Sequence, residues 1–304
     1  MKKFSKKQWI KFSIAAVLYL LFTLWMQNAW LLLGLIVLVD IFLTGYIPWG
    51  AWKRTKNPQV RNVLDDILFA LVAVYFINIF IFQNYQIPSS SLEKSLLVGD
   101  YLFVSKLSYG PRVPNTPVAF PLVQNTLPFF NCKSYLDWPE WDYKRVKGLG
   151  HVKRNDIVVF NFPAGDTVAL KVQNPDYYHL VEQYGREAIL LNKADFGDVI
   201  YRPVDKRENY VKRCIGMPGD TIDIVDGKVY LNGSDTPLDE PYLHEPMEPE
   251  EPQHYEVPDG CYFMLGDNRN YSNDARRWTH KYVKRDKLVA KVLFQYFPKI
   301  QKLN

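Results

Sequence analysis

Cysteine and histidine are scarce in this sequence. Its 304 residues include three cysteines, Cys132, Cys214 and Cys261, and five histidines. The cysteines form no C-x-x-C pair and the histidines lack the spacing of metal ligands, so neither a zinc site nor a redox motif is indicated. We therefore expect no metal ion and no cofactor. One disulfide stays open, although isolated cysteines are commonly buried as small apolar residues.

A strong excess of one charge is also missing. The net charge is +5, and much of it lies beside apolar segments rather than on a soluble face with interleaved aromatic side chains. Only such a face would be typical of a phosphate-tracking surface, so nucleic acid is not expected as a partner. The basic residues beside the apolar segments are Lys2, Lys3, Lys6, Lys7, Lys53, Arg54, Lys56 and Arg61.

Charged side chains are almost absent from the long apolar stretches in the first third of the chain, where Asp40 is an exception. The first stretch is too long for one membrane helix, which needs about 20 residues, and the polar pair Gln27-Asn28 divides it. Residues 1–86 are therefore predicted to be a membrane anchor in contact with lipid. Its three expected transmembrane helices lie at about 10–26, 29–48 and 66–83.

Basic clusters precede the first of these spans and follow the second. The positive-inside rule places both clusters in the cytoplasm, so that the first two spans form a hairpin and the third leads outward. We expect a multi-pass protein of the cytoplasmic (inner) membrane with its soluble domain extracytoplasmic, on the periplasmic side. A cleavable secretory signal is the alternative for residues 1–26, but no A-x-A-like site of small residues follows that apolar run.

Short β-type runs bounded by Gly, Pro, Asn and Asp replace the helical pattern after residue 86. Asp226-Gly227 joins two of them as a two-residue hairpin turn. Residues 87–304 are therefore predicted to be a mainly β domain, with insertions at about 110–149 and 164–207. The candidate strands are 101–107, 156–162, 209–216, 220–225, 228–233, 261–266 and 288–297.

Three segments of this domain carry reactive or polar residues: IPSSSLEKSLLVGD (87–100), NYVKRCIGMPGD (209–220) and LGDNRNYSNDARRW (265–278). Taken singly, each has an ordinary explanation, because serine runs form linkers or caps and strand lysines point to solvent. Lys212 would be a usable base only if burial lowers its pKa. A Ser-His-Asp triad would need a histidine with an aspartate partner, and none is obvious.

Together with GHVKRNDIVVFNFP (150–163), these segments resemble the type I signal peptidases, the membrane-bound proteases that remove signal peptides from exported proteins. The resemblance covers 87–107, 150–163, 209–233 and 261–297, in the family's order. It implies that Ser91, the second serine of P-S-x-S, is the nucleophile and that Lys212 is the general base. Ser89 would help the backbone N–H of Ser91 to form the oxyanion hole.

The resemblance also implies that Ser272 orients the lysine amine, with Asp274 and Arg276 as structural supports. The chain departs from the family pattern at Glu93 and Lys94, beside the nucleophile. This departure creates an S-x-x-K string, which is typical of penicillin-binding proteins and β-lactamases. Their S-D-N and K-T-G elements are missing here, so the string is expected to be coincidental.

Segments 84–89 and 208–212 resemble the two walls of the family's substrate groove, into which an extended peptide adds by main-chain hydrogen bonds. Shallow apolar pockets for small P1 and P3 residues are implied, giving A-x-A specificity. The implied pocket residues are Tyr85, Ile87, Leu92, Leu96, Tyr210 and Val211.

The expected function is that of a serine endopeptidase that cleaves N-terminal signal peptides from exported preproteins through an acyl-enzyme. Two alternatives belong to other classes. One is a penicillin-interacting acyl-enzyme. The other is a non-enzymatic membrane assembly protein on a peptidase fold, because a fold alone does not guarantee chemistry.

Overall fold

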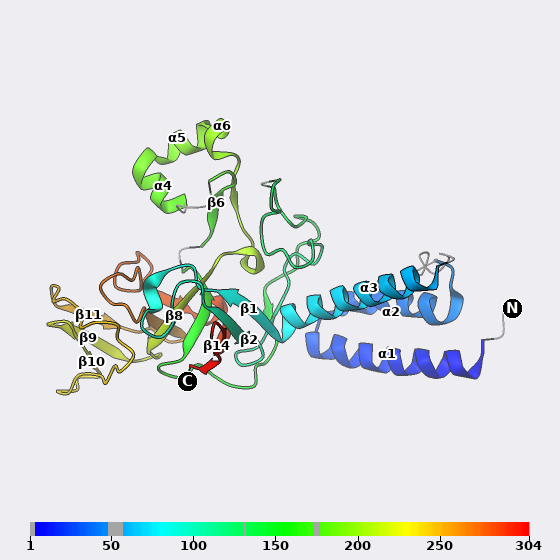
Figure 1. Cartoon of the computed structure of the whole chain (residues 1–304), viewed down its shortest axis with the longest axis horizontal. Helices are drawn as coiled ribbons and strands as arrows, with labels where there is room; N and C mark the ends of the chain where they lie inside the picture. Colours follow the sequence, from blue (N-terminus) through cyan, green and yellow to red (C-terminus); the bar gives the residue numbers. More distant parts are fainter. Residues whose placement is uncertain (1–3, 48–56, 131, 164, 173–176, 304) are drawn as a thin grey trace. The chain divides into compact units, whose positions relative to one another are not determined.

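The computed structural model describes residues 4–47, 57–130, 132–163, 165–172 and 177–303. They fall into two compact units, Met1–Val74 and Tyr75–Asn304. The first unit is helical, and the second holds the sheets (Figure 1).

Two helices are long and apolar enough to cross a membrane: α1 (Lys6–Met26) and α3 (Pro58–Phe80). The start of α1 is fixed by a capping box, in which the Ser5 hydroxyl accepts from the Gln8 backbone N–H and the Gln8 side chain accepts from the Ser5 N–H. The helix α3 starts earlier than the predicted span of 66–83, at Pro58, and it also ends earlier than that span, at Phe80. The reason is that Gln83 and Asn84 already belong to a strand.

The predicted second span, 29–48, is a broken helix. It consists of a 3-10 turn η1 (Ala29–Leu33), α2 (Gly34–Val39) and a π turn η2 (Asp40–Thr44). This helical stretch is shorter than the about 20 residues that a membrane crossing needs, so a third crossing stays a prediction.

Hydrogen-bond donors that are close in sequence surround the carboxylate of Asp40. Its carboxylate accepts hydrogen bonds from the backbone N–H groups of Tyr46 (2.8 Å) and Ile47 (2.9 Å) and from the Thr44 hydroxyl. These donors explain how one acid is accommodated at the end of an apolar helix.

The second unit is built around an eight-stranded antiparallel sheet, which confirms the prediction of a mainly β domain. Its strands follow the order β1-β2-β14-β5-β8-β12-β13, with β15 added to β14. The bounds are β1 (Phe82–Gln86), β2 (Tyr101–Ser105), β14 (Leu288–Phe297), β5 (Ile157–Asn161), β8 (Asn209–Gly216), β12 (Cys261–Leu265), β13 (Tyr282–Lys284) and β15 (Gln301–Lys302).

A second, three-stranded sheet has the order β10-β9-β11 and lies apart from the large one (Figure 1). Its hairpin turn is the predicted one, because Asp226 and Gly227 both have positive φ, 48° and 71°. The strands are β9 (Thr221–Val225), β10 (Lys228–Leu231) and β11 (Gln253–Glu256). All seven strands expected from the sequence are present.

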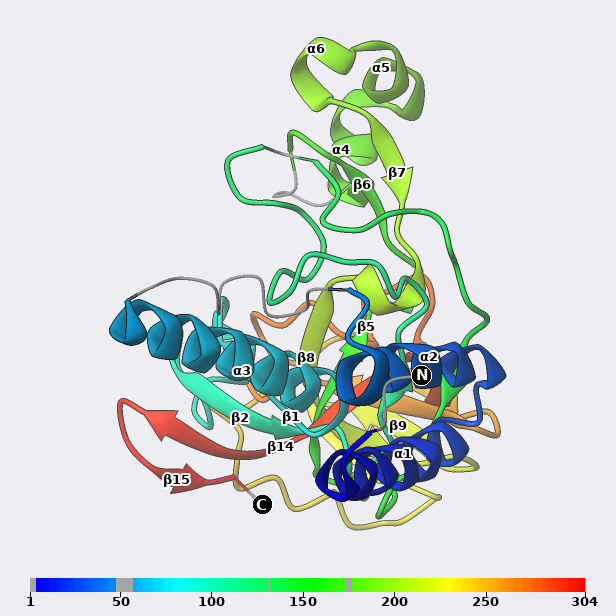
Figure 2. The ribbon, with the colours of Figure 1, turned by 90° about the vertical axis from the view of Figure 1, so that its right-hand side faces the viewer.

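Both predicted insertions are bounded by short strand pairs. β3 (Arg112–Val113) pairs with β4 (Lys144–Arg145) around the first insertion. In the second, β6 and β7 form a stalk that carries three short helices (Figure 2). The elements of the second insertion are β6 (Thr167–Ala169), α4 (Tyr177–Tyr184), α5 (Arg186–Leu191), α6 (Lys193–Phe196) and β7 (Val199–Tyr201).

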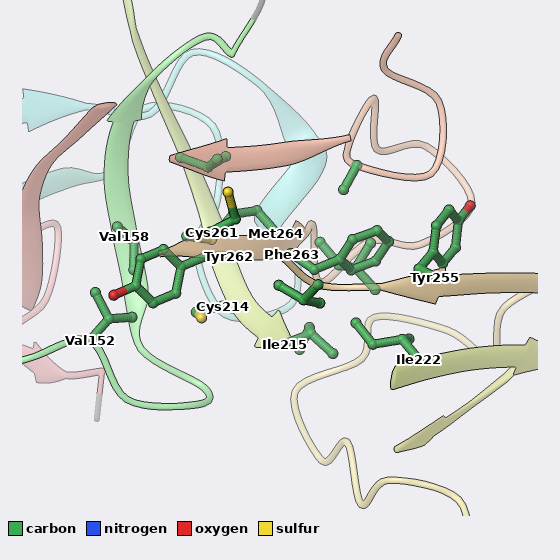
Figure 3. Packing of buried hydrophobic residues seen from close by; sticks show 14 of the residues in the cluster. Val152, Val158, Cys214, Ile215, Ile222, Tyr255, Cys261, Tyr262, Phe263 and Met264 are labelled. Carbon is green, nitrogen blue, oxygen red and sulfur yellow. The ribbon is translucent and has the colours of Figure 1, made fainter. Parts of the chain in front are cut away.

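The main core joins the two sheets. Ile215 of β8, Phe263 of β12 and Ile222 of β9 lie together in one cluster (Figure 3). Cys214 and Cys261 are buried, as expected, whereas Cys132 is exposed, and all three thiols are free. Cys214 and Cys261 therefore act as packing residues rather than as partners in a disulfide.

The strands of this core pack closely around Gly216, where they leave no room for a side chain. A Cβ at this position would lie 2.5 Å from Ile222 Cδ1, 2.8 Å from Phe263 Cβ and 2.9 Å from Val257 Cγ2. We expect Gly216→Ala to lower the free energy of unfolding by about 1–3 kcal/mol, because a tightly packed core cannot accept a methyl group without shifting. Chemical denaturation measures this change.

Gly150→Ala is the matched control, because the nearest atom to its added Cβ would be the Ser108 carbonyl oxygen at an ordinary 3.6 Å. Equal losses of stability in the two variants would contradict the proposed packing at Gly216.

Candidate active site

Ser91 lies on a short 3-10 turn, η4 (Ser90–Leu92), that follows β1. Pro88 keeps the preceding chain extended, and Ser89 itself has the extended backbone angles φ −137° and ψ 158°. Leu92 anchors the turn because its side chain is almost fully buried in the second core cluster. Ser91 is thereby held with only 8% of its surface exposed.

Lys212 reaches this turn from the middle of β8, where it pairs with Val158 of β5. Its Nζ donates a 2.6 Å hydrogen bond to Ser91 Oγ, and the side chain is only 5% exposed. Burial lowers the pKa of Lys212 to about 8, against the opposing attraction of Asp274 and Asp267. The pKa of this amine is therefore closer to neutral pH than that of an exposed lysine.

Ser89 lies beside the nucleophile, with its Oγ 3.3 Å from Ser91 Oγ. The structure therefore brings Ser89, Ser91 and Lys212 together in one place. Lys94, by contrast, donates to the Pro241 carbonyl oxygen at 3.0 Å and is exposed. Its amine is engaged away from Ser91.

Asp274 and Arg276 form a buried ion pair next to the site. Arg276 donates to both carboxylate oxygens, from Nε at 2.9 Å and from Nη2 at 3.0 Å. The same carboxylate accepts from the Gly266 N–H at 3.1 Å, so it fixes the loop that follows β12. Arg276 also donates to the Arg269 carbonyl oxygen at 2.6 Å, which closes this loop on itself.

Ser272 is buried against Gly266 and the Ser91 backbone. A Cβ on Gly266 would collide with Ser272 Oγ and would lie 2.5 Å from the Ser91 carbonyl oxygen, so this close approach requires glycine. Within the part of the chain that the structure describes, Ser272 Oγ has no hydrogen-bond partner. The hydrogen bond to Lys212 that the resemblance implied is therefore not formed in this structure.

Sequence reasoning missed a second ion pair, between Arg213 and Asp267. The guanidinium donates to both carboxylate oxygens, from Nε at 2.7 Å and from Nη2 at 2.6 Å, and the Ser95 hydroxyl adds a 2.6 Å bond. Both residues stood in segments already singled out, Arg213 directly after Lys212 and Asp267 in the Gly-Asp-Asn-Arg turn. Nothing in the sequence indicated that they meet.

Asn268 was missed as well. Its backbone N–H donates to the Ser91 carbonyl oxygen at 3.1 Å, and its side-chain amide donates to the Ser90 carbonyl oxygen at 3.2 Å. Two hydrogen bonds from one residue therefore hold the turn that carries the nucleophile.

Three of the predicted pocket residues are packed in the core. Ile87, Leu92 and Leu96 are 4%, 1% and 0% exposed and belong to one cluster. Val211 packs partly against the same cluster.

The two predicted pocket tyrosines are half-buried. The Tyr85 hydroxyl accepts from Asn209 Nδ2 at 2.9 Å, and burial raises its pKa. Tyr210 lies against Phe162, with ring centroids 5.0 Å apart. Each tyrosine keeps part of its surface open to a ligand.

The described residues give little support for a metal site or for a histidine as the base. Among the residues that the structure describes, no three His, Cys, Asp or Glu side chains are grouped so that they could hold a metal ion. His254 pairs with Asp223 at 2.6 Å, but both lie at open positions of the small sheet. The titratable group in contact with Ser91 is the amine of Lys212.

Comparison with known proteins gives a consistent result. The chain is 28% identical to the probable signal peptidase I-2 of Synechocystis over 81% of this chain and 78% of that protein. It is 28% identical to the signal peptidase I of Leptolyngbya laminosa, over 83% and 86% of the two chains. A solved structure of a signal peptidase I from Enterococcus faecalis aligns over 47% of this chain and 98% of that one, at 23% identity. Its TM-score of 0.29 says nothing about the fold.

A family described as "Signal peptidase, peptidase S26" matches residues 60–297. This stretch includes Ser91 and Lys212, together with the loop that surrounds Ser272. Because the match covers most of the sequence, the chain belongs to the signal peptidase family, peptidase S26, and is a serine peptidase.

Proposed function

We propose that this chain is a type I signal peptidase that removes N-terminal signal peptides from exported preproteins, using Ser91 as nucleophile and Lys212 as general base. The observation that carries the proposal is the 2.6 Å hydrogen bond between a buried lysine amine and a buried serine hydroxyl. A serine needs an adjacent base to become nucleophilic, and a lysine whose pKa is lowered by burial can supply one.

In the first step, the neutral amine of Lys212 takes the proton from Ser91 Oγ while that oxygen attacks the scissile carbonyl carbon. The Ser91 N–H and the Ser89 hydroxyl donate to the oxyanion that forms. Lys212 then gives its proton to the leaving amine, and the C–N bond breaks. An acyl ester on Ser91 remains.

In the second step, Lys212 takes a proton from a water molecule that attacks the ester carbonyl. The collapse of this intermediate releases the new carboxylic acid, and the proton returns to Ser91 Oγ. Every proton is moved by one amine, so no cofactor is needed for the sequence of steps.

The substrate is proposed to bind as an added strand. Among the described strands, β1 pairs only with β2, and the Asn209–Lys212 part of β8 pairs only with β5, because pairing with β12 starts at Arg213. These two edges keep unpaired N–H and C=O groups that an extended peptide can engage.

The preference for small residues, of the A-x-A type, follows from the packing beside this groove. Ile87, Leu92 and Leu96 are already surrounded by core neighbours, so they offer apolar walls and little depth. A large side chain would have to displace packed atoms, which cores resist. Small P1 and P3 residues avoid that cost.

The proposed location is the cytoplasmic (inner) membrane, with the catalytic domain on the outer side. Two helices long and apolar enough to cross a membrane support the anchoring. The orientation is supported by the basic residues at both ends of the first apolar region, which favour the cytoplasmic side.

We expect Ser91→Ala and Lys212→Ala each to lower the rate of preprotein cleavage by about three orders of magnitude or more, because each removes a group that the reaction requires. The measurement is cleavage of a membrane-inserted preprotein by the purified full-length chain. Lys94→Ala is the matched control, since it removes a neighbouring lysine that bonds to the Pro241 carbonyl oxygen. Loss of cleavage in the control with retention in Lys212→Ala would exchange the roles of the two lysines.

The pH dependence of kcat/KM should reflect the pKa of Lys212. A general base acts when deprotonated, so with a Lys212 pKa of about 8 the value of kcat/KM should rise about tenfold per pH unit below pH 8 and level off above it. Initial rates on a peptide without groups that ionise in this range measure the profile. A rate that stays constant from about pH 6 to 9, or that rises only near pH 10, would show that no buried lysine is the base.

A further inference from the structure

A cavity of about 370 Å³ lies beside β1, and Ser91 is not among the residues that line it. Its lining includes Gln83–Gln86 of β1 and Asn209 of β8, which are the strands whose unpaired edges form the proposed substrate groove. Asn209 and Tyr85 join the two strands by the hydrogen bond described above. The cavity is therefore a continuation of the groove.

Positive charge dominates this cavity. Lys106, Arg112 and Lys206 line it together with one carboxylate, that of Asp205. One oxygen of Asp205 is engaged, because Oδ2 accepts from the backbone N–H of Thr116 at 3.2 Å and from its hydroxyl at 2.9 Å, whereas Oδ1 has no hydrogen-bond partner among the described residues. The cavity holds a surplus of cations.

The direct hydrogen-bond and ring partners of the three cations are neutral, although the charge of Asp205 also acts on Arg112 and Lys206. Lys106 donates to the Asn78 carbonyl oxygen at 2.5 Å, and Arg112 donates to Asn161 Oδ1 at 2.5 Å. The Lys206 amine lies 5.6 Å from the centre of the Tyr135 ring. Within the described ranges, none of the three forms an ion pair with a carboxylate. One carboxylate for three basic side chains leaves buried positive charge without full compensation, which is costly, and an anionic ligand would offset that cost.

The cations are also close enough to repel one another. Burial, followed by the charges of Arg112 and Lys206, lowers the pKa of Lys106 to about 7. Burial, followed by the charge of Arg145, lowers the pKa of Arg112 to about 10. A carboxylate among them would relieve this repulsion.

The position of the cavity indicates which part of a substrate reaches it. The helix α3 ends at Phe80 and β1 begins at Phe82, so the cavity lies at the end of the groove where the candidate span leaves the membrane. If the proposed function holds, the apolar segment of the preprotein shares the bilayer with α3 and precedes the cleavage point. The substrate residues before the scissile bond then pass the cavity.

The spacing gives the approximate substrate position. Gln86 and Gln83 precede Ser91 by five and eight residues, and a substrate strand advances by about 3.3 Å per residue, as β1 does. A side chain about five to eight residues before the scissile bond is therefore level with the three cations.

We propose that this cavity is a specificity subsite that accepts an acidic side chain about five to eight residues before the scissile bond, with Arg112 and Lys206 as the residues that bind its carboxylate. This proposal rests on the proposed function of the chain. It concerns residues on the N-terminal side of the cleavage point and leaves the chemistry at Ser91 unchanged.

The test uses the full-length chain and synthetic substrate peptides that carry Glu, Gln or Lys at single positions from three to ten residues before the scissile bond. We expect kcat/KM to follow the order Glu, Gln, Lys, with about a fivefold step between Glu and Gln, at positions five to eight only. Arg112→Gln and Lys206→Gln should remove the preference for Glu, whereas Arg112→Lys should retain part of it. Lys228→Gln, at an exposed position of β10, controls for a change in net charge.

The outcomes separate this proposal from the proposed function. Cleavage of all peptides at equal rates would overturn the subsite while leaving the peptidase intact, whereas no Ser91-dependent cleavage of any peptide would overturn the function itself. Unchanged peptide preference in Arg112→Gln, with weaker binding to phosphatidylglycerol vesicles but not to phosphatidylcholine vesicles, would also overturn the subsite and assign the cavity to a lipid headgroup. Thermal unfolding at the wild-type temperature excludes misfolding of the variants.

Discussion

The contact between the Lys212 amine and the Ser91 hydroxyl depends on how the charges around it are balanced. Two carboxylates, those of Asp274 and Asp267, act on the amine and favour its protonated form. Each carboxylate is bound in a two-point ion pair, one by Arg276 and the other by Arg213. Because the arginines take up most of the negative charge, burial outweighs attraction and the amine can lose its proton near neutral pH.

The pair of Arg213 and Asp267 also holds distant segments of the chain together. Arg213 follows Lys212 on β8, and its partner Asp267 lies in the loop after β12, next to Asn268. Asn268 in turn donates to the backbone carbonyl of Ser91, so the loop, the strand and the nucleophile turn are joined by side chains of adjacent residues. The geometry of the dyad is thus fixed by the contact of β8 with β12 rather than by the serine turn alone.

Much of the fold was predictable because its signals are local. Short β-type runs bounded by Gly, Pro, Asn and Asp indicated the strands. Asp226-Gly227 indicated a hairpin because its positive φ angles follow from residue type. The site was different, since Ser91 and Lys212 were identified only by resemblance, and their approach to 2.6 Å joins positions 121 residues apart. The burial of Ile87 and Leu96 and the pairing of Arg213 with Asp267 depend on such long-range contacts, which no local pattern encodes. The broken helix at 29–44 also escaped prediction, because a stretch that is apolar apart from Asp40 and Thr44 carries no periodicity to mark where it ends.

The two proposals together give the insertions a role in substrate recognition, because residues of both insertions line the cavity that continues the proposed groove. The core strands supply the two unpaired edges, and these can bind any extended backbone with little regard to its side chains. Selectivity must then come from groups that project into the groove from outside the sheet. Arg112 belongs to the first insertion and Lys206 to the end of the second, and both reach the cavity beside β1. If the proposals hold, the sheet supplies the chemistry and the insertions supply the recognition surface, which is the usual division between a rigid scaffold and its loops.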